Sequence, residues 1–152
     1  MTVRPQLDPS DTRASLLLRR TPAQWYCLAA GLSLLAAGIV GFFVDASFET
    51  GSSLSRGELI VFDVNGWHNL VHLLTGLLLV LAAPQASSAR AVALVFGLTY
   101  AVVSLIGLID GRDIFGLLPI NAADNVLHLA LSVLGVLAAL VSGNRTPEPR
   151  HV

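Results

Sequence analysis

The chain is short, apolar and poor in charge: 54% of its 152 residues are hydrophobic, 12% are charged, and the formal net charge is −1. Soluble domains carry about 25% charged residues, so this composition excludes a disordered chain and is not typical of a cytosolic enzyme. The single cysteine excludes an internal disulfide, and the near-neutral charge gives no reason to expect a nucleic-acid partner.

Four apolar segments with few charges follow one another and predict four transmembrane helices, at about residues 23–44, 66–83, 91–110 and 122–141. Polar tails flank them at residues 1–22 and 143–152. Trp25 and Tyr26 at the start of the first helix suit the lipid–water interface. The predicted fold is therefore an all-α four-transmembrane-helix bundle over residues 23–142, in a multi-pass protein whose surroundings are the lipid bilayer.

The distribution of arginine predicts the orientation of these helices. Seven arginines lie before the first helix, between the second and third, or after the fourth, whereas the other two loops contain only Arg56 and Arg112. Because positively charged segments stay in the cytoplasm, both termini are predicted to be cytoplasmic, with the loops at 45–64 and 110–121 facing outward. The expected location is the plasma membrane.

The second and fourth helices open with similar sequences, 56 residues apart. The matched pairs are Asn65 and Asn121, Asn69 and Asn125, and His72 and His128. The first and third helices also correspond, at an offset of 66. Since each unit holds two helices, both units enter the membrane in the same direction. The pattern predicts two tandem helix hairpins, related by a parallel pseudo-twofold axis along the membrane normal.

The strings NGWHNLVHLLTGLLLVLAA and GLLPINAADNVLHLALSVLGVLAAL, which contain these matches, resemble the DUF4383 family. The resemblance covers roughly residues 25–141. It implies a small four-helix membrane protein of a kind found largely in actinobacteria. It carries no biochemical activity over to this chain.

Polar side chains are concentrated in the first turns of the second and fourth helices. Asparagines and histidines at spacings of four and seven residues lie on one face of a helix. Because polar groups at membrane depth are costly, we expect them to face inward and to meet at the outward mouth of the bundle. This predicted polar cluster comprises Asn65, His68, Asn69, His72, Asn121, Asp124, Asn125 and His128.

The favoured function is that of a non-enzymatic structural or accessory membrane subunit, whose partner is a membrane protein or a second copy. Asn65 and Asn121 stand where helix N-caps belong, and Asp124 completes a capping box. The histidines then hydrogen-bond across helices. The sequence contains no nucleophile elbow, P-loop, dinucleotide fingerprint or paired-cysteine motif, so enzymatic activity is not favoured.

Two other functions stay open. His68, His72, Asp124 and His128 form a set of three nitrogens and one carboxylate that suits zinc and also accepts copper or iron. A related hypothesis has His72 and His128 as the axial ligands of one haem. A third function, a small transporter or channel component, would use the same side chains and would require an oligomer.

Small residues at helical spacing predict close helix packing, within the chain or between two copies. These residues are Ser33, Ala37, Gly41, Gly107 and Gly111.

Overall fold

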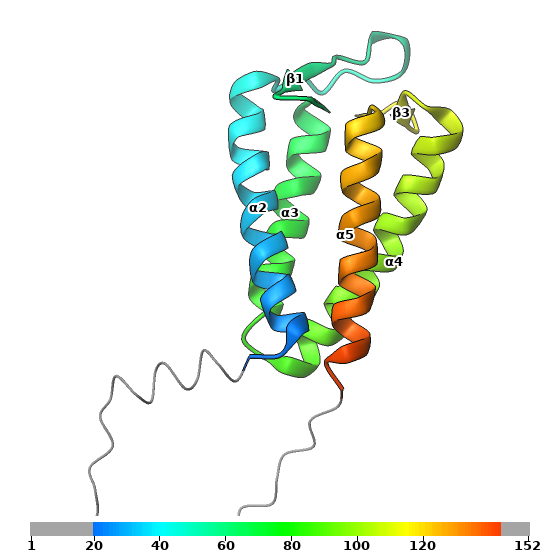
Figure 1. The fold of residues 1–152 in the computed structure, drawn as a ribbon. Coiled ribbons are helices and arrows are strands. Elements are labelled where there is room, and N and C mark those ends of the chain that lie inside the picture. Colours follow the sequence, from blue (N-terminus) through cyan, green and yellow to red (C-terminus); the bar gives the residue numbers. More distant parts are fainter. Residues whose placement is uncertain (1–19, 144–152) are drawn as a thin grey trace, which may run out of the picture.

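The computed structural model describes residues 20–143, which form a bundle of helices with two short β-hairpins at one end (Figure 1). Most of both predicted tails lies outside the described residues. The helices are α2 (Pro22–Val44), α3 (Gly66–Ala82), α4 (Ala86–Asp110) and α5 (Ala122–Val141). The strands are β1 (Gly57–Leu59), β2 (Phe62–Val64), β3 (Asp113–Ile114) and β4 (Leu118–Pro119), and a single 3₁₀ turn, η1, spans Gly51–Ser53.

The helix boundaries follow from local capping chemistry. Thr21 caps α2, and its backbone N–H donates to the Gln24 side chain, which completes a capping box. α4 begins at Ala86, ahead of the expected start at 91, because the polar residues around Arg90 continue the helix although they lower its hydropathy. The Arg90 Nε donates to the Ala139 carbonyl of α5 over 3.0 Å, which fixes the polar start of α4 to the end of the neighbouring helix.

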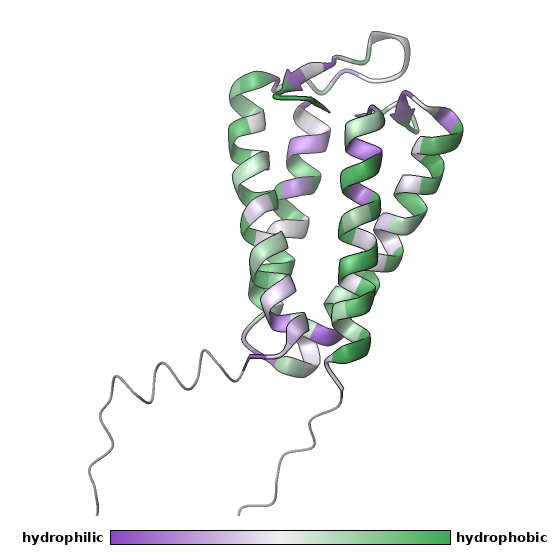
Figure 2. Ribbon diagram, in the orientation of Figure 1, coloured by the Kyte–Doolittle hydropathy of each residue, from purple (hydrophilic) through white to green (hydrophobic). Residues whose placement is uncertain are grey.

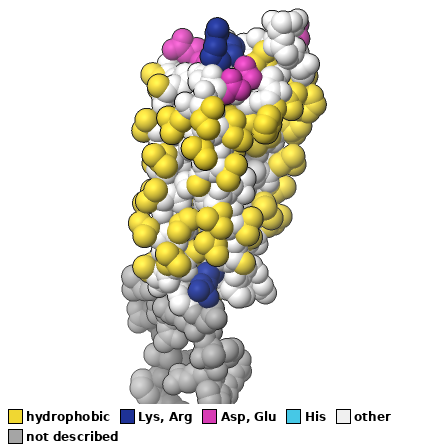
Figure 3. Space-filling view, turned by 90° about the vertical axis from the view of Figure 1, so that its right-hand side faces the viewer, with side chains coloured by type: hydrophobic (Ala, Val, Ile, Leu, Met, Phe, Trp, Pro, Cys, Tyr) yellow, Lys and Arg dark blue, Asp and Glu magenta, His cyan; other side chains and the backbone are white. Residues whose placement is uncertain are grey.

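The bundle has the surface of a membrane protein. α2, α4 and α5 are each long and apolar enough to cross a membrane. α3 has 17 residues, about 26 Å of helix, and is shorter. Figure 3 shows hydrophobic side chains spread over one face of the bundle between charged ends, and large apolar residues such as Phe43 are almost fully exposed, at 87%. Apolar exposure on this scale fits contact with lipid.

The helices pack as two closely associated pairs, α2 with α3 and α4 with α5. At the end of the bundle where α2 begins and α5 ends, here called the terminal end, the core is built from small residues. Ala23, Ala89 and Ala93 are fully buried there, and so is Cys27, whose Sγ lies 3.4 Å from the Ala89 carbonyl. Small side chains let all four helices approach one another at this end.

The opposite end, here called the hairpin end, is covered by the two β-hairpins. β1 pairs with β2 and β3 pairs with β4, each in antiparallel fashion. Arg56 joins the hairpins, because its guanidinium donates to the Arg112 carbonyl and lies 3.5 Å from Asp63 and 3.4 Å from Asp113. The two hairpins therefore close the hairpin end of the bundle, and the contacts of Arg56 hold them to each other.

Candidate functional site

Asn65 and Asn121 cap α3 and α5 directly beneath the hairpins. The Asn65 Oδ1 accepts from the His68 backbone N–H over 2.9 Å, and the Asn121 Oδ1 accepts from Ala123 over 2.8 Å. Their amide groups reach across the bundle: Asn65 Nδ2 donates to the Leu117 carbonyl, and Asn121 Nδ2 donates to the Val61 carbonyl. Each asparagine therefore starts its own helix and also fastens the hairpin of the other helix pair.

The carboxylate of Asp124 is part of the same cap. Its Oδ2 accepts from the backbone N–H groups of Asn121 and Asp63, each over 3.0 Å. The side chain of Asp63 in turn accepts from Asn121 Nδ2 over 3.1 Å. Two backbone donors already hold the Asp124 carboxylate, which accounts for its burial although no basic side chain among residues 20–143 pairs with it.

Asn69 and Asn125 lie one turn deeper, and each faces a glycine of the paired helix. A Cβ atom on Gly41 would collide with the Asn69 side chain, and one on Gly107 would collide with that of Asn125. The Asn69 Nδ2 donates to the Asp45 carbonyl at the end of α2 over 2.8 Å. Close contact between the paired helices at this depth therefore depends on glycine opposite asparagine.

Three histidines converge on one point inside the bundle. One potential ligand atom from each of His68, His72 and His128 lies within 4.8 Å of the other two. The His68 and His72 rings are 4.4 Å apart between centroids, and His68 and His128 are 6.1 Å apart. His68 and His128 are only 2% and 5% exposed. Hydrophilic residues accordingly appear in the half of α3 and of α5 that is nearer the hairpin end (Figure 2).

This group, here called the histidine trio, has unused hydrogen-bonding capacity. Within the part of the chain that the structure describes, the Nδ1 atoms of all three rings are buried and have no hydrogen-bond partner. A buried polar atom without a partner costs about 1–3 kcal/mol. The remaining predicted ligand, Asp124, is not in the group that surrounds a common point. The trio therefore offers three nitrogens, while the carboxylate serves the helix cap.

The chemistry of this donor set fits a metal ion. Neutral imidazole is a ligand of zinc, copper, iron and nickel, and three imidazoles leave one coordination position open. Tetrahedral zinc would bring the three nitrogens to about 3.3 Å from one another. The ligand atoms lie within 4.8 Å of one another, so binding would require the side chains to rotate toward a common ion.

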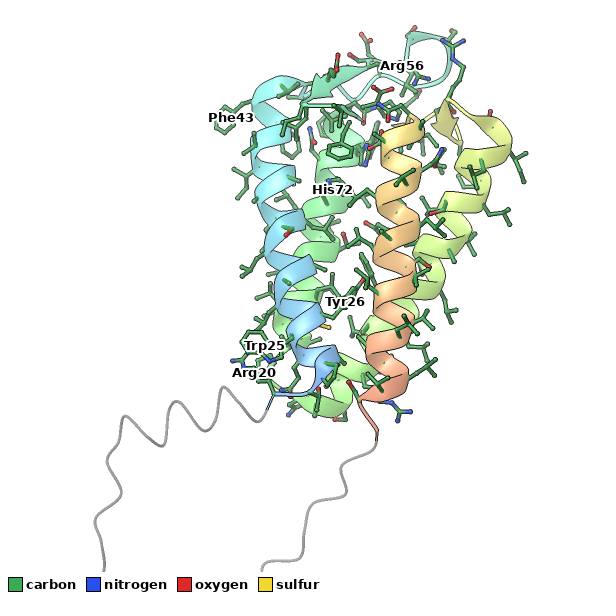
Figure 4. The ribbon with its side chains drawn as sticks, viewed as in Figure 1. Arg20, Trp25, Tyr26, Phe43, Arg56 and His72 are labelled. Carbon is green, nitrogen blue, oxygen red and sulfur yellow. The ribbon has the colours of Figure 1, made fainter. Side chains whose placement is uncertain are left out.

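A cavity of about 380 Å³ adjoins the trio, between α2 and α5. Its walls are mostly apolar, and its polar groups toward the hairpin end are His72, His128 and Asp124. Near the terminal end, Tyr26 extends from α2 toward α5 (Figure 4) and donates through its hydroxyl to the Leu131 carbonyl over 2.7 Å. Sequence reasoning missed this cavity.

The small residues singled out in the sequence have three different positions. Gly41 and Gly107 meet the asparagines of the paired helices. Ser33 and Ala37 line the cavity, so their small size leaves space instead of bringing two helices together. Gly111 ends α4 with a φ of 78°, a left-handed conformation that favours glycine, and a Cβ there would meet nothing within 4 Å.

The comparisons with known proteins agree with the resemblance seen in the sequence. A family model described as "Domain of unknown function (DUF4383)" matches residues 24–141, which is well over half of the chain. The predicted family resemblance is thereby confirmed. No curated protein and no solved structure matches.

Proposed function

We propose that this chain, which belongs to the DUF4383 family, is an integral membrane protein that binds a transition-metal ion through His68, His72 and His128. One observation carries the proposal: two buried imidazoles and one half-buried imidazole, from two helices, present ligand atoms within 4.8 Å of one another. Their Nδ1 atoms have no other partner among the described residues. A bound ion would take one ring nitrogen from each histidine and would hold α3 to α5 in the half of the bundle nearer the hairpin end.

We propose further that all four helices cross the plasma membrane, with both termini in the cytoplasm. α3 supports this because its two ends are joined to spanning helices, and its shorter length is about 4 Å less than a typical hydrocarbon core. Arg20 and Arg90 lie toward the terminal end, where Arg20 sits over the Trp25 ring at 5.6 Å. The hairpin end carries acidic side chains beside Arg56.

The two helix pairs are proposed to be tandem repeats. A Cβ atom on Gly31 of α2 would meet Val80 of α3, and one on Gly97 of α4 would meet Val136 of α5. The two glycines are 66 residues apart and the two valines are 56 residues apart, so these contacts repeat with the offsets found in the sequence. The crossed cap bonds to the Val61 and Leu117 carbonyls keep the offset of 56 as well. In this arrangement Asp124 occupies the place of His68, so one repeat supplies two imidazoles and the other supplies one.

A structural or accessory role beside another membrane protein, or beside a second copy, is the second proposal. The cap bonds of Asn65, Asn121 and Asp124 support it, because they stabilise both helix starts without any ligand. It gives no role to the three Nδ1 atoms that lack a partner in the described part of the chain, and metal binding therefore stands first.

Metal content tests the proposal directly. The protein would be purified in detergent with a histidine-free tag and without chelator, then equilibrated with zinc or copper and passed over a desalting column. We expect about one metal atom per chain in the wild type. His72→Ala and His128→Ala should each lower the content several-fold, because two imidazoles hold a divalent ion far less tightly than three.

His151, which lies outside the described residues, gives the matched control, since His151→Ala removes one histidine and leaves the trio intact. Each variant is scored only if it elutes as a single peak with wild-type helix content. His72→Gln provides a second test at the same position if alanine prevents folding. Wild-type protein that retains no metal, or equal content in His72→Ala and His151→Ala, would overturn the metal centre.

A further inference from the structure

We propose that the cavity between α2 and α5 binds a neutral, membrane-soluble carbonyl compound of the quinone type. The ring of such a ligand would fill the apolar part of the cavity, and a carbonyl oxygen would face His72 and His128. The cavity shares His72 and His128 with the metal proposal, but its other walls are formed by residues outside the histidine trio, so the site does not require a metal ion. The proposal rests on the shape, the lining and the charge of the cavity.

The cavity has the size and the lining of a small-molecule site. Its volume of about 380 Å³ lies within the range of about 300–1,000 Å³ that is typical of ligand pockets. Ala30, Leu34 and Phe62 give it apolar walls from α2 and from the first hairpin. A few polar groups at one end of an apolar pocket are the usual means of orienting a ligand.

The ligand would enter from the lipid. Leu127 and Leu134 line the cavity and are 42% and 56% exposed, so the cavity wall on α5 is accessible from outside the bundle. The outside of the bundle faces the bilayer if α2 and α5 span it. The hairpin residues Leu59 and Phe62 close the cavity toward the hairpin end. A tail attached to the ring would therefore leave sideways between the two helices and remain among the acyl chains.

The polar end selects for an uncharged hydrogen-bond acceptor. A neutral imidazole carries one N–H, and the ring nitrogens of His72 and His128 include Nδ1 atoms without a partner within the described residues. A carbonyl oxygen accepts a hydrogen bond from such a group, or takes the open position of a metal held by the trio. Asp124 lines the same end, and its negative charge would repel the carboxylate of a fatty acid.

Two neighbouring alanines of α2 supply a matched test. Ala37 lines the cavity, whereas Ala36 is exposed and is not part of the lining. Ala37→Phe should fill the space that the ring needs, and Ala36→Phe adds the same side chain on the lipid side. Binding of a naphthoquinone with one isoprenoid unit would be titrated calorimetrically into nanodiscs of the wild type and both variants. Palmitate would be titrated in parallel, and all samples would be measured with and without prior chelator treatment.

We expect saturable naphthoquinone binding by the wild type, at least tenfold weaker binding by Ala37→Phe, and binding within about twofold of the wild type by Ala36→Phe. Ser33→Phe is the second filling variant if Ala37→Phe does not fold. Equal binding by the two alanine variants, or no saturable binding by the wild type, would overturn the site. Palmitate that displaces the quinone would overturn the neutral carbonyl ligand. Metal content should be unchanged in Ala37→Phe, so the metal proposal is tested separately from the cavity proposal.

Discussion

The seam between α2 and α5 and the seam between α3 and α4 occupy corresponding places in the proposed repeat, yet they are filled differently. The first contains the 380 Å³ cavity that reaches His72 and His128. The second contains a cavity of about 260 Å³ whose lining includes no histidine. Phe96 and Tyr100 occupy this second seam, with stacked rings 4.0 Å apart between centroids.

The difference lies in side-chain volume at positions related by the offset of 66. Ala30 and Leu34 of α2 correspond to Phe96 and Tyr100 of α4. The Tyr100 ring packs edge-on against His128 at 5.0 Å and so shields the trio from that side. Two similar backbones thus give one seam that is open toward the histidines and one that is closed toward them. Access to the histidines is therefore set by two aromatic residues and not by the path of the helices.

The largest effect on stability is expected when the closed seam is opened. Phe96→Ala removes a buried ring that stacks on Tyr100 and also meets Tyr26 edge-on. We expect a loss of about 3–5 kcal/mol in the free energy of unfolding, measured by denaturant titration in detergent. Leu98→Ala on the exposed surface of α4, where Leu98 is 54% exposed, is the control and should change stability by less than about 1 kcal/mol. Equal losses would show that the aromatic pair does not hold this seam closed.

An intermediate effect is expected where the paired helices touch. Gly41→Ala pushes against Asn69, and Gly107→Ala pushes against Asn125 and Ile120. Each change should destabilise the protein by about 1–3 kcal/mol, because the opposing groups are buried and overpacking displaces them. The measurement is the same unfolding titration, applied to both variants side by side.

A double variant separates overpacking from any other effect of the added methyl group. Gly41→Ala combined with Asn69→Ala removes the group that the new methyl would strike. The double variant should therefore lose less free energy of unfolding than the sum of the losses in the two single variants. Strict additivity would show that contact between Gly41 and Asn69 is not what limits the approach of α2 to α3.

The sequence predicts the helices and their caps well because these features are local. A run of apolar residues long enough to span a bilayer allows few other structures, and an asparagine just before such a run has a side chain of the right length to cap it. The convergence of His72 and His128 could also be expected, since equal positions in two similar helices lie at equal depth. The family match adds to the same local signal.

The remaining features depend on contacts between segments far apart in the chain. The hairpins turn at Ile60 and Phe115, which have positive φ values of 64° and 56° that side chains rarely adopt, so propensity gave no sign of them. The cavity exists because the small side chains of Ser33 and Ala37 leave space beside α2. In a sequence, small residues predict close helix packing equally well, so they did not reveal the cavity. Whether Asp124 caps a helix or joins the histidines depends on the Asp63 backbone, which the spacing of residues does not encode.

The smallest effect is expected at the deep end of the open seam, where Tyr26 spans from α2 to α5. Tyr26→Phe removes the hydroxyl bonded to the Leu131 carbonyl and should lower the free energy of unfolding by about 0.5–1.5 kcal/mol. Quinone affinity should change by less than about twofold, because the hydroxyl is directed at the backbone of α5 and its ring remains to line the cavity. A large loss of affinity with unchanged stability would place the polar end of the ligand at Tyr26 and away from His72. The same titrations that test the cavity would therefore also establish the direction in which the ligand lies within it.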